Sequence, residues 1–168
     1  SEVGRGTKFQ IFLPRKDVPH RAAAPKPVTH EASGKCNETL LLVDDEVAVR
    51  RVAEGVLKHY GYNILSAEDG LEALEVYEEN KDDISLVLLD LTMPRLSGKK
   101  TLVELRKRHE NVPVVVCSGY LVDLKGFEEE TGFRPEAAIQ KPYNIKDLAS
   151  KIREVLDRAA SGVAHSGS

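Results

Sequence analysis

Tryptophan is absent from this chain of 168 residues, methionine occurs once, cysteine twice, and aromatic residues make up only 5%. No apolar run approaches the ~18 residues that a membrane-spanning helix requires, and no signal peptide opens the sequence. Cys36 lies in a polar stretch and Cys117 in the apolar run VPVVVCSG, so we expect two free thiols, without a disulfide framework or a cysteine metal site. These absences favour a cytoplasmic globular protein over a membrane protein or a disulfide-rich secreted one.

Charge of one sign is not in large excess, because the net charge is only −3, but it is unevenly distributed. Residues 1–38 hold seven Lys or Arg and four Asp or Glu, which leaves 17 basic and 23 acidic residues for the remainder. An acidic body repels phosphate backbones, so we expect no direct contact with nucleic acid.

Proline marks the organisation of the chain. Four of the eight prolines lie in residues 14–38, which also lack helical or strand periodicity, so we interpret this segment as a flexible linker. We assign residues 1–13 to a separate N-terminal element, residues 39–158 to one folded domain, and the Ser- and Gly-rich end, residues 159–168, to a flexible tail.

Within residues 39–158, apolar runs alternate five times with amphipathic stretches of helical period. The predicted strands are TLLLV, YNILSA, ISLVLLD, VPVVVCS and AAIQ. After the first of them, Val49, Val52, Ala53 and Val56 repeat with helical spacing. Strand–helix alternation with nearly continuous apolar strands predicts an α/β fold, a doubly wound parallel sheet covered by helices on both faces.

Polar side chains follow several of these strands directly. Asp44 and Asp45 end the first, Asp90 the third and Ser118 the fourth, while Lys141 follows the fifth. Parallel strands place their carboxyl ends at one edge of the sheet, so these groups should converge there. Three close carboxylates repel unless a cation offsets the repulsion, and an all-oxygen site open to water favours Mg²⁺. The stretch LLLVDDE is thus predicted to hold a metal.

The remaining groups predict phosphoryl chemistry. A lysine ammonium and a serine hydroxyl suit phosphoryl oxygens, and the carboxylate of Asp90 can attack phosphorus to give an aspartyl phosphate. Taken singly, Asp45 could instead cap the following helix, and Asp90 could be a turn residue before TMPRLSG.

Four stretches, LLLVDDE, LVLLDLTMPRLSG, VVVCSGY and QKPY, together resemble the receiver domain of two-component response regulators. The resemblance covers roughly residues 39–158 and implies a flavodoxin-like (βα)5 fold with strand order 2-1-3-4-5. It implies that Asp90 is the phosphoacceptor, that Asp45, Asp90 and the Thr92 backbone carbonyl bind Mg²⁺ directly, and that Asp44 reaches the metal through water. Ser118 then matches the switch hydroxyl and Lys141 its partner lysine.

One position departs from that family pattern. Three residues before the lysine the family often has Tyr or Phe, which moves with the switch hydroxyl, whereas this chain has Ala138. The hypothesis that follows is a domain used mainly for phosphoryl relay or for feedback on a kinase.

The stretch GRGTKFQIFLP, within residues 1–14, resembles the last glycine box and closing strand of the ATP-binding domain of sensor histidine kinases. Its place before a linker and a receiver implies the C-terminal part of a hybrid histidine kinase. The implied partner is a histidine kinase dimerisation or phosphotransfer domain, in the same chain or a separate protein. Whether that kinase is anchored in a membrane, or this fragment is itself an enzyme, is left open.

Two other functions compete with the phosphoacceptor. Aspartate-nucleophile phosphatases need a second aspartate two residues after the first as general acid, and that position is Thr92 here. A pseudo-receiver that only binds partners would usually lack one of the site residues, and this chain has them all.

Overall fold

The structure, a computed structural model, describes residues 37–163, in which strands and helices alternate. The strands are β1 Thr39–Val43, β2 Asn63–Ala67, β3 Ile84–Asp90, β4 Val114–Ser118 and β5 Ala137–Gln140. The helices are α1 Val47–His59, α2 Gly70–Asn80, α3 Gly98–Arg108, α4 Leu124–Thr131 and α5 Ile145–Val163. Cys36 and the N-terminal segments assigned above to the ATP-binding remnant and most of the linker lie outside the described residues.

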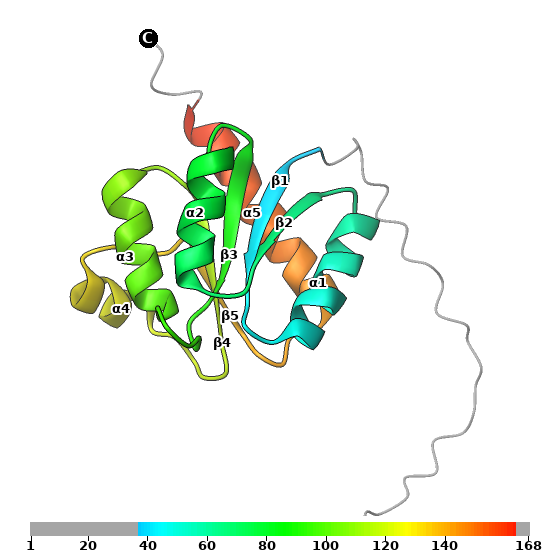
Figure 1. Cartoon of the computed structure of the whole chain (residues 1–168). Coiled ribbons are helices and arrows are strands. Elements are labelled where there is room, and N and C mark those ends of the chain that lie inside the picture. The colour runs from blue at the N-terminus through cyan, green and yellow to red at the C-terminus, as the bar shows by residue number, and fades with distance from the viewer. Residues whose placement is uncertain (1–36, 164–168) are drawn as a thin grey trace, which may run out of the picture. The chain divides into compact units, whose positions relative to one another are not determined.

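The five strands form one parallel sheet in the order β2-β1-β3-β4-β5 (Figure 1). β1 and β3 lie next to each other, and the chain leaves them toward opposite edges of the sheet, so the carboxyl ends of these two strands form the switch point of the topology. The predicted flavodoxin-like fold and its strand order are confirmed.

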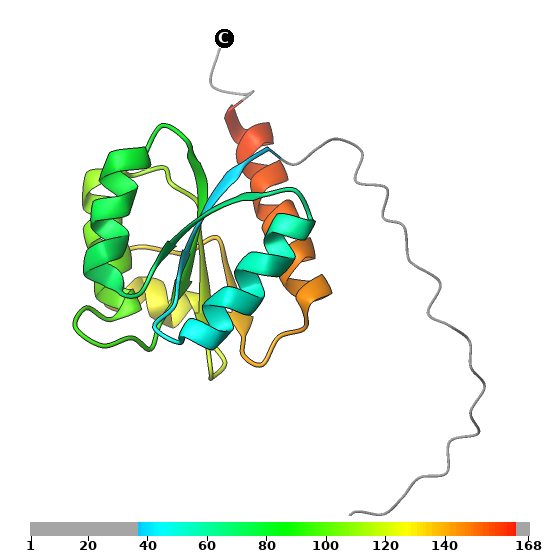
Figure 2. The ribbon, with the colours of Figure 1, turned by 45° about the vertical axis from the view of Figure 1, so that its right-hand side comes forward.

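Helices cover both faces of the sheet (Figure 2), and each face carries its own apolar core. One face packs against α2, α3 and α4 through residues such as Tyr77, Leu102 and Phe127. The other face packs against α1 and α5, with Leu57 and Ile152 fully buried. Burial on both faces explains why β1, β3 and β4 read as continuous apolar runs rather than alternating ones.

Local signals fix several helix ends. Asp69 caps α2 by accepting hydrogen bonds from the backbone N–H groups of Leu71 and Glu72. α4 ends at Gly132, whose φ of 76° lies in the left-handed region that glycine tolerates. The start of α5 carries a capping hydrogen bond, in which Asn144 Oδ1 accepts from Asp147 N–H at 2.9 Å.

The last helix is longer than predicted. α5 continues to Val163, so residues 159–163, predicted above to belong to a flexible tail, are helical. The pair of alanines that follows Arg158 has the highest helix propensity of any residue type and lets the helix extend beyond its packed face.

Candidate functional site: an acidic pocket at the carboxyl edge of the sheet

The carboxyl ends of β1 and β3 bring three acids together. Asp44, Asp45 and Asp90 each place one carboxylate oxygen within 4.8 Å of the other two. Asp44 and Asp90 are buried, with 3% and 4% exposure, whereas Asp45 is partly exposed. The predicted convergence of residues from distant parts of the sequence is therefore present.

Lys141 lies between two of these acids. Its Nζ donates to Asp44 Oδ2 at 2.7 Å and to Asp90 Oδ2 at 2.8 Å. Burial by itself would lower the pKa of Lys141, but the hydrogen bonds and charges of the two carboxylates outweigh it and raise the pKa above its usual value. The lysine therefore stays charged and offsets repulsion between the two carboxylates in the pocket.

The peptide bond from Lys141 to Pro142 is cis.

The structure distinguishes the two alternative roles considered for these acids, helix capping by Asp45 and a turn role for Asp90. Asp45 does not cap α1, because the N-cap is Glu46 and no side chain accepts a capping hydrogen bond there. Among the described residues, the Asp45 carboxylate has no hydrogen-bond or ion-pair partner. Asp90 does take part in a turn, since its Oδ1 accepts from Thr92 N–H at 3.2 Å, and this contact leaves its Oδ2 facing Lys141.

Ser118, at the end of β4, is fully buried. Its Oγ accepts a hydrogen bond from the backbone N–H of Tyr120 at 3.1 Å, so the hydroxyl faces the start of the loop that follows the strand. The neighbouring Cys117 is no nucleophile, because burial raises the pKa of its thiol to about 12 and keeps it protonated near neutral pH.

Two residues near the acids, Arg50 and Tyr143, are not among the predicted site residues. Arg50 of α1 donates from its guanidinium to the main-chain carbonyl of Asp44, which orders the turn that carries both β1 acids. Tyr143 lines the pocket, and burial, followed by the neighbouring charges, raises its pKa to about 12. Helical spacing places Arg50 near the start of α1 but cannot show that its side chain folds back on the loop.

A groove of about 1010 Å³ opens from the acids toward α1 and the start of α5. Asp45, Asp90, Thr92 and Lys141 line its polar end. Its apolar wall includes Ala48, Val49, Val52, Tyr143 and Leu148. Val52 has 61% exposure, although its spacing alone suggests a core position. Part of the apolar face of α1 therefore borders the pocket instead of filling the core.

The donor set fits a hard divalent cation. All three candidate ligands are carboxylates, their oxygens cluster within 4.8 Å, and one of them, Asp45, has no competing partner among the described residues. Neither His nor Cys is a member of the cluster, so a soft or borderline metal has no preferred ligand here. The residues fit Mg²⁺ with water completing its coordination.

A flavodoxin-like sheet with acids, a lysine and a serine at its switch point defines the class of CheY-like α/β domains. The family model of the response regulator receiver domain matches residues 40–153, and the chain belongs to this family. None of the described helices combines the length and apolar character needed to cross a bilayer.

Known proteins are similar in sequence and in structure. The sensor kinase CckA of Brucella abortus is 37% identical over 168 residues, which covers 94% of this chain but only 17% of that kinase. The crystal structure of the receiver domain from the hybrid histidine kinase CckA is 37% identical, with a TM-score of 0.58 over 70% of this chain and 98% of that domain. The response regulator TrrA of Thermotoga maritima, in complex with Mg²⁺ and BeF, is 27% identical with a TM-score of 0.61, over 70% of this chain and 98% of that protein.

Proposed function

We propose that this domain accepts a phosphoryl group from phosphohistidine onto Asp90 in the presence of Mg²⁺. The observation that carries the proposal is the double contact of Lys141, which holds the Asp44 and Asp90 carboxylates from one side while Asp45 remains free among the described residues. Membership of the receiver family supports the same chemistry.

The proposed reaction uses the groups at the pocket in distinct roles. An Asp90 oxygen attacks phosphorus, the P–N bond to the donor imidazole breaks, and the bonding electrons leave with the imidazole. Asp45, Asp90 and the Thr92 carbonyl would hold Mg²⁺, and Asp44 would reach it through water. When bound, the metal would supply positive charge that offsets the charge of the phosphoryl oxygens. Lys141 stabilises one of these oxygens, and the Ser118 hydroxyl turns from Tyr120 to donate to another.

Acetyl phosphate tests this proposal without a protein donor. Incubation with Mg²⁺ should add the mass of one phosphoryl group to the intact chain, and Asp90→Asn should remove the increment. Asp83→Asn, which changes an exposed aspartate in the loop before β3, is the matched control and should load like the wild type. Omission of Mg²⁺ should also prevent loading. A wild-type chain that gains no mass would instead support a pseudo-receiver that only binds partners.

The pocket does not favour a phosphatase of external phosphoesters. Its nucleophile would be Asp90, but the general-acid position two residues later is Thr92, whose side chain cannot supply a carboxylic proton. We expect slow loss of the phosphoryl group to water and no turnover of p-nitrophenyl phosphate. A malachite-green assay for released phosphate checks this directly.

The proposed context is the C-terminal receiver of a cytoplasmic hybrid histidine kinase region. The alignment with the Brucella sensor kinase supports it, because it covers 94% of this chain and so includes residues outside the receiver match. The phosphodonor would be a dimerisation or phosphotransfer domain. The groove beside α1 supports a helical donor, since its apolar wall leads directly to Asp90 and can receive the helix that carries the histidine.

A further inference from the structure

The loop from β3 to α3 carries Thr92, whose backbone carbonyl is a proposed Mg²⁺ ligand. Backbone hydrogen bonds hold the two ends of this loop: Leu91 N–H donates to the Cys117 carbonyl at 2.9 Å, and Gly98 N–H donates to the Leu91 carbonyl at 3.3 Å. Between these ends, residues 93–96 form no backbone hydrogen bond within the part of the chain that the structure describes. Side-chain contacts must therefore fix the middle of the loop.

One residue in the middle of this loop has an unusual backbone conformation. Arg95 has a φ of 60°, and within residues 37–163 it is the one residue other than glycine with a positive φ. Glycine adopts this left-handed conformation without steric cost, whereas the Cβ of an arginine crowds the backbone. Such strain persists only where the surrounding structure compensates for it, so the contacts of the Arg95 side chain indicate what it does.

The Arg95 guanidinium reaches the loop between β2 and α2. It donates to Glu68 Oε1 at 3.1 Å and forms an ion pair with Asp69 Oδ2. The pair with Glu68 is exposed on both sides and contributes little, but the Asp69 side chain is only 1% exposed. Because a buried carboxylate without a partner cation is costly, the Arg95–Asp69 ion pair holds the two loops together.

The segment that receives Arg95 is fixed in place and also contacts the acids of β1. Asp69 caps α2, and the next residue, Gly70, packs so closely that a Cβ there would lie 2.9 Å from the Leu96 carbonyl oxygen. Two residues before Asp69, the Ala67 carbonyl accepts from Asp44 N–H at 3.2 Å. This short segment therefore contacts both the turn that carries the β1 acids and the loop that follows β3.

We propose that Arg95 is a positioning residue for the metal site, because it joins the loop that carries the Thr92 carbonyl to the segment that holds Asp44. The Arg95–Asp69 ion pair fixes the ligands of β1 and of the β3–α3 loop relative to each other before a metal binds. Ligands that are already in place lose less conformational entropy on binding. The inference rests on the proposed Mg²⁺-dependent function and assigns a role to a side chain whose described contacts lie outside the acidic pocket.

The sign of the change in Mg²⁺ affinity of Arg95→Gln tests the proposal. Removal of a nearby positive charge should by itself tighten the binding of a cation, whereas loss of the ion pair that positions the loop should weaken it. We expect the dissociation constant of Mg²⁺ to rise about tenfold, the low end of the usual loss when a group that orients a metal ligand is removed. NMR titration of the full chain with magnesium chloride, followed at amides of the pocket, measures this constant without phosphorylation.

Other substitutions separate the backbone of Arg95 from its side chain. Arg95→Gly relieves the φ of 60° but lacks the ion pair, so it should bind Mg²⁺ as weakly as Arg95→Gln. Arg95→Lys keeps a cation that can face Asp69 and should recover most of the affinity. Arg134→Gln is the matched control, because it removes an arginine of similar exposure, 58% against 55%, from the loop before β5. It should leave Mg²⁺ binding unchanged.

The outcomes separate this inference from the function beneath it. Wild-type or tighter Mg²⁺ binding by Arg95→Gln and Arg95→Gly would overturn the positioning role and leave the phosphoacceptor function intact. An affinity of Arg95→Lys no better than that of Arg95→Gln would overturn it as well. A wild-type chain that binds no Mg²⁺ would overturn the proposed function together with the positioning role. Melting curves verify that each variant is folded at the temperature of the titration.

Discussion

At the scale of single residues, Lys141 balances the charge of the pocket. It is the cation that contacts both buried carboxylates, Asp44 and Asp90, within the part of the chain that the structure describes. Two buried carboxylates without a partner cation are costly, so the stability of the metal-free domain depends on this lysine.

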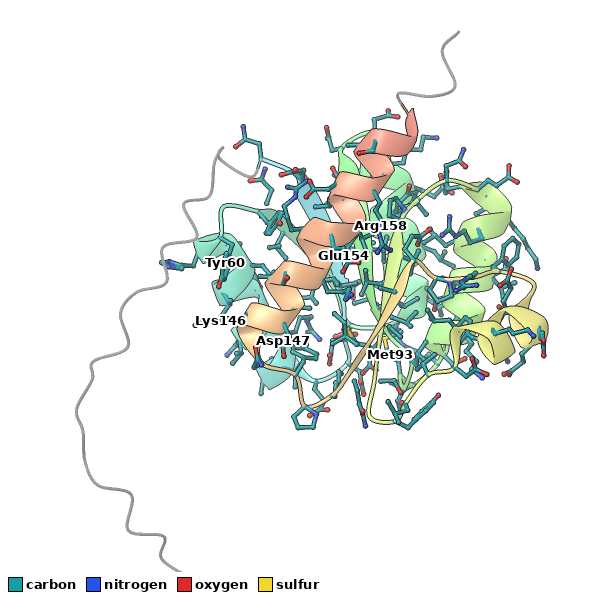
Figure 3. All side chains as sticks on the ribbon, turned by 180° about the vertical axis from the view of Figure 1, so that it is seen from behind. Tyr60, Met93, Lys146, Asp147, Glu154 and Arg158 are labelled. Carbon is teal, nitrogen blue, oxygen red and sulfur yellow. The ribbon has the colours of Figure 1, made fainter. Side chains whose placement is uncertain are left out.

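Lys141→Met should therefore destabilise the metal-free domain by roughly 3 kcal/mol, the usual cost of removing one partner from a buried ion pair. Mg²⁺ should recover much of this loss, because it supplies the missing positive charge. Urea unfolding with and without Mg²⁺ measures both effects. Lys146→Met, which removes an exposed lysine from α5 (Figure 3), is the control. Equal stability of Lys141→Met and wild type without Mg²⁺ would contradict the charge argument.

Gly98 sets how closely α3 approaches the acceptor strand. A Cβ at this position would lie 2.1 Å from the Asp90 carbonyl oxygen and 2.7 Å from Leu91 Cα, which is too close for any side chain. Gly98→Ala should cost about 1–3 kcal/mol as the backbone shifts, and should slow loading of Asp90.

Gly55, in contrast to Gly98, has room for a side chain. It lies inside α1 with no atom near the position of its missing Cβ. Gly55→Ala should stabilise the domain by about 0.5–1 kcal/mol, because glycine costs conformational entropy in a helix. Urea unfolding of Gly98→Ala and Gly55→Ala tests both predictions. A change of the same sign in the free energy of unfolding of the two variants would contradict them.

At the scale of elements, Arg106 joins the carboxyl end of α3 to the amino ends of β4 and β5. Its side chain is 7% exposed, donates to the Glu110 carbonyl at 2.6 Å and pairs with Glu136 at 2.5 Å. Glu136 also accepts from the backbone N–H of Val114. One buried guanidinium therefore ties three elements together at the edge opposite the pocket.

Arg106→Ala should lower the free energy of unfolding by roughly 2 kcal/mol, less than a fully buried pair because Glu136 is 35% exposed. The neighbouring Arg108 is 47% exposed and 4.0 Å from Glu78, so Arg108→Ala should leave stability nearly unchanged. Acetyl phosphate loading should persist in both variants when folded. Chemical denaturation distinguishes them, and equal losses would remove the role assigned to Arg106.

At the scale of the whole molecule, we expect Ala138 to limit how far a change at the pocket reaches into the rest of the domain. It lies half-buried in β5 beside Val116 and packs against the core under α4. A methyl group has no rotamer change that could follow the Ser118 hydroxyl. We expect beryllofluoride with Mg²⁺ to shift amide resonances strongly around the pocket and weakly in α4 and β5. Equally strong shifts in those elements would contradict a domain used mainly as a relay.

Much of the fold was predictable because its signals are local. Apolar runs bounded by acids mark β1 and β3, and the Asn144–Asp147 spacing marks the start of α5. Helical periodicity, however, could not tell that Val52 faces solvent at the pocket, because apolar residues with the same spacing occur on buried and on exposed helix faces. Nor could composition show that Ala159 and Ala160 continue α5.

By itself, the sequence determined which chemical groups end which strands, and hence that carboxylates, a lysine and a serine would meet at one edge of a parallel sheet. Only the tertiary structure decided how they pair: Lys141 with Asp44 and Asp90, and Asp45 with none of the described residues. The physical reason is range. Strand and helix signals act between near neighbours, whereas Lys141 and Asp44 are 97 positions apart and meet only when the sheet is complete.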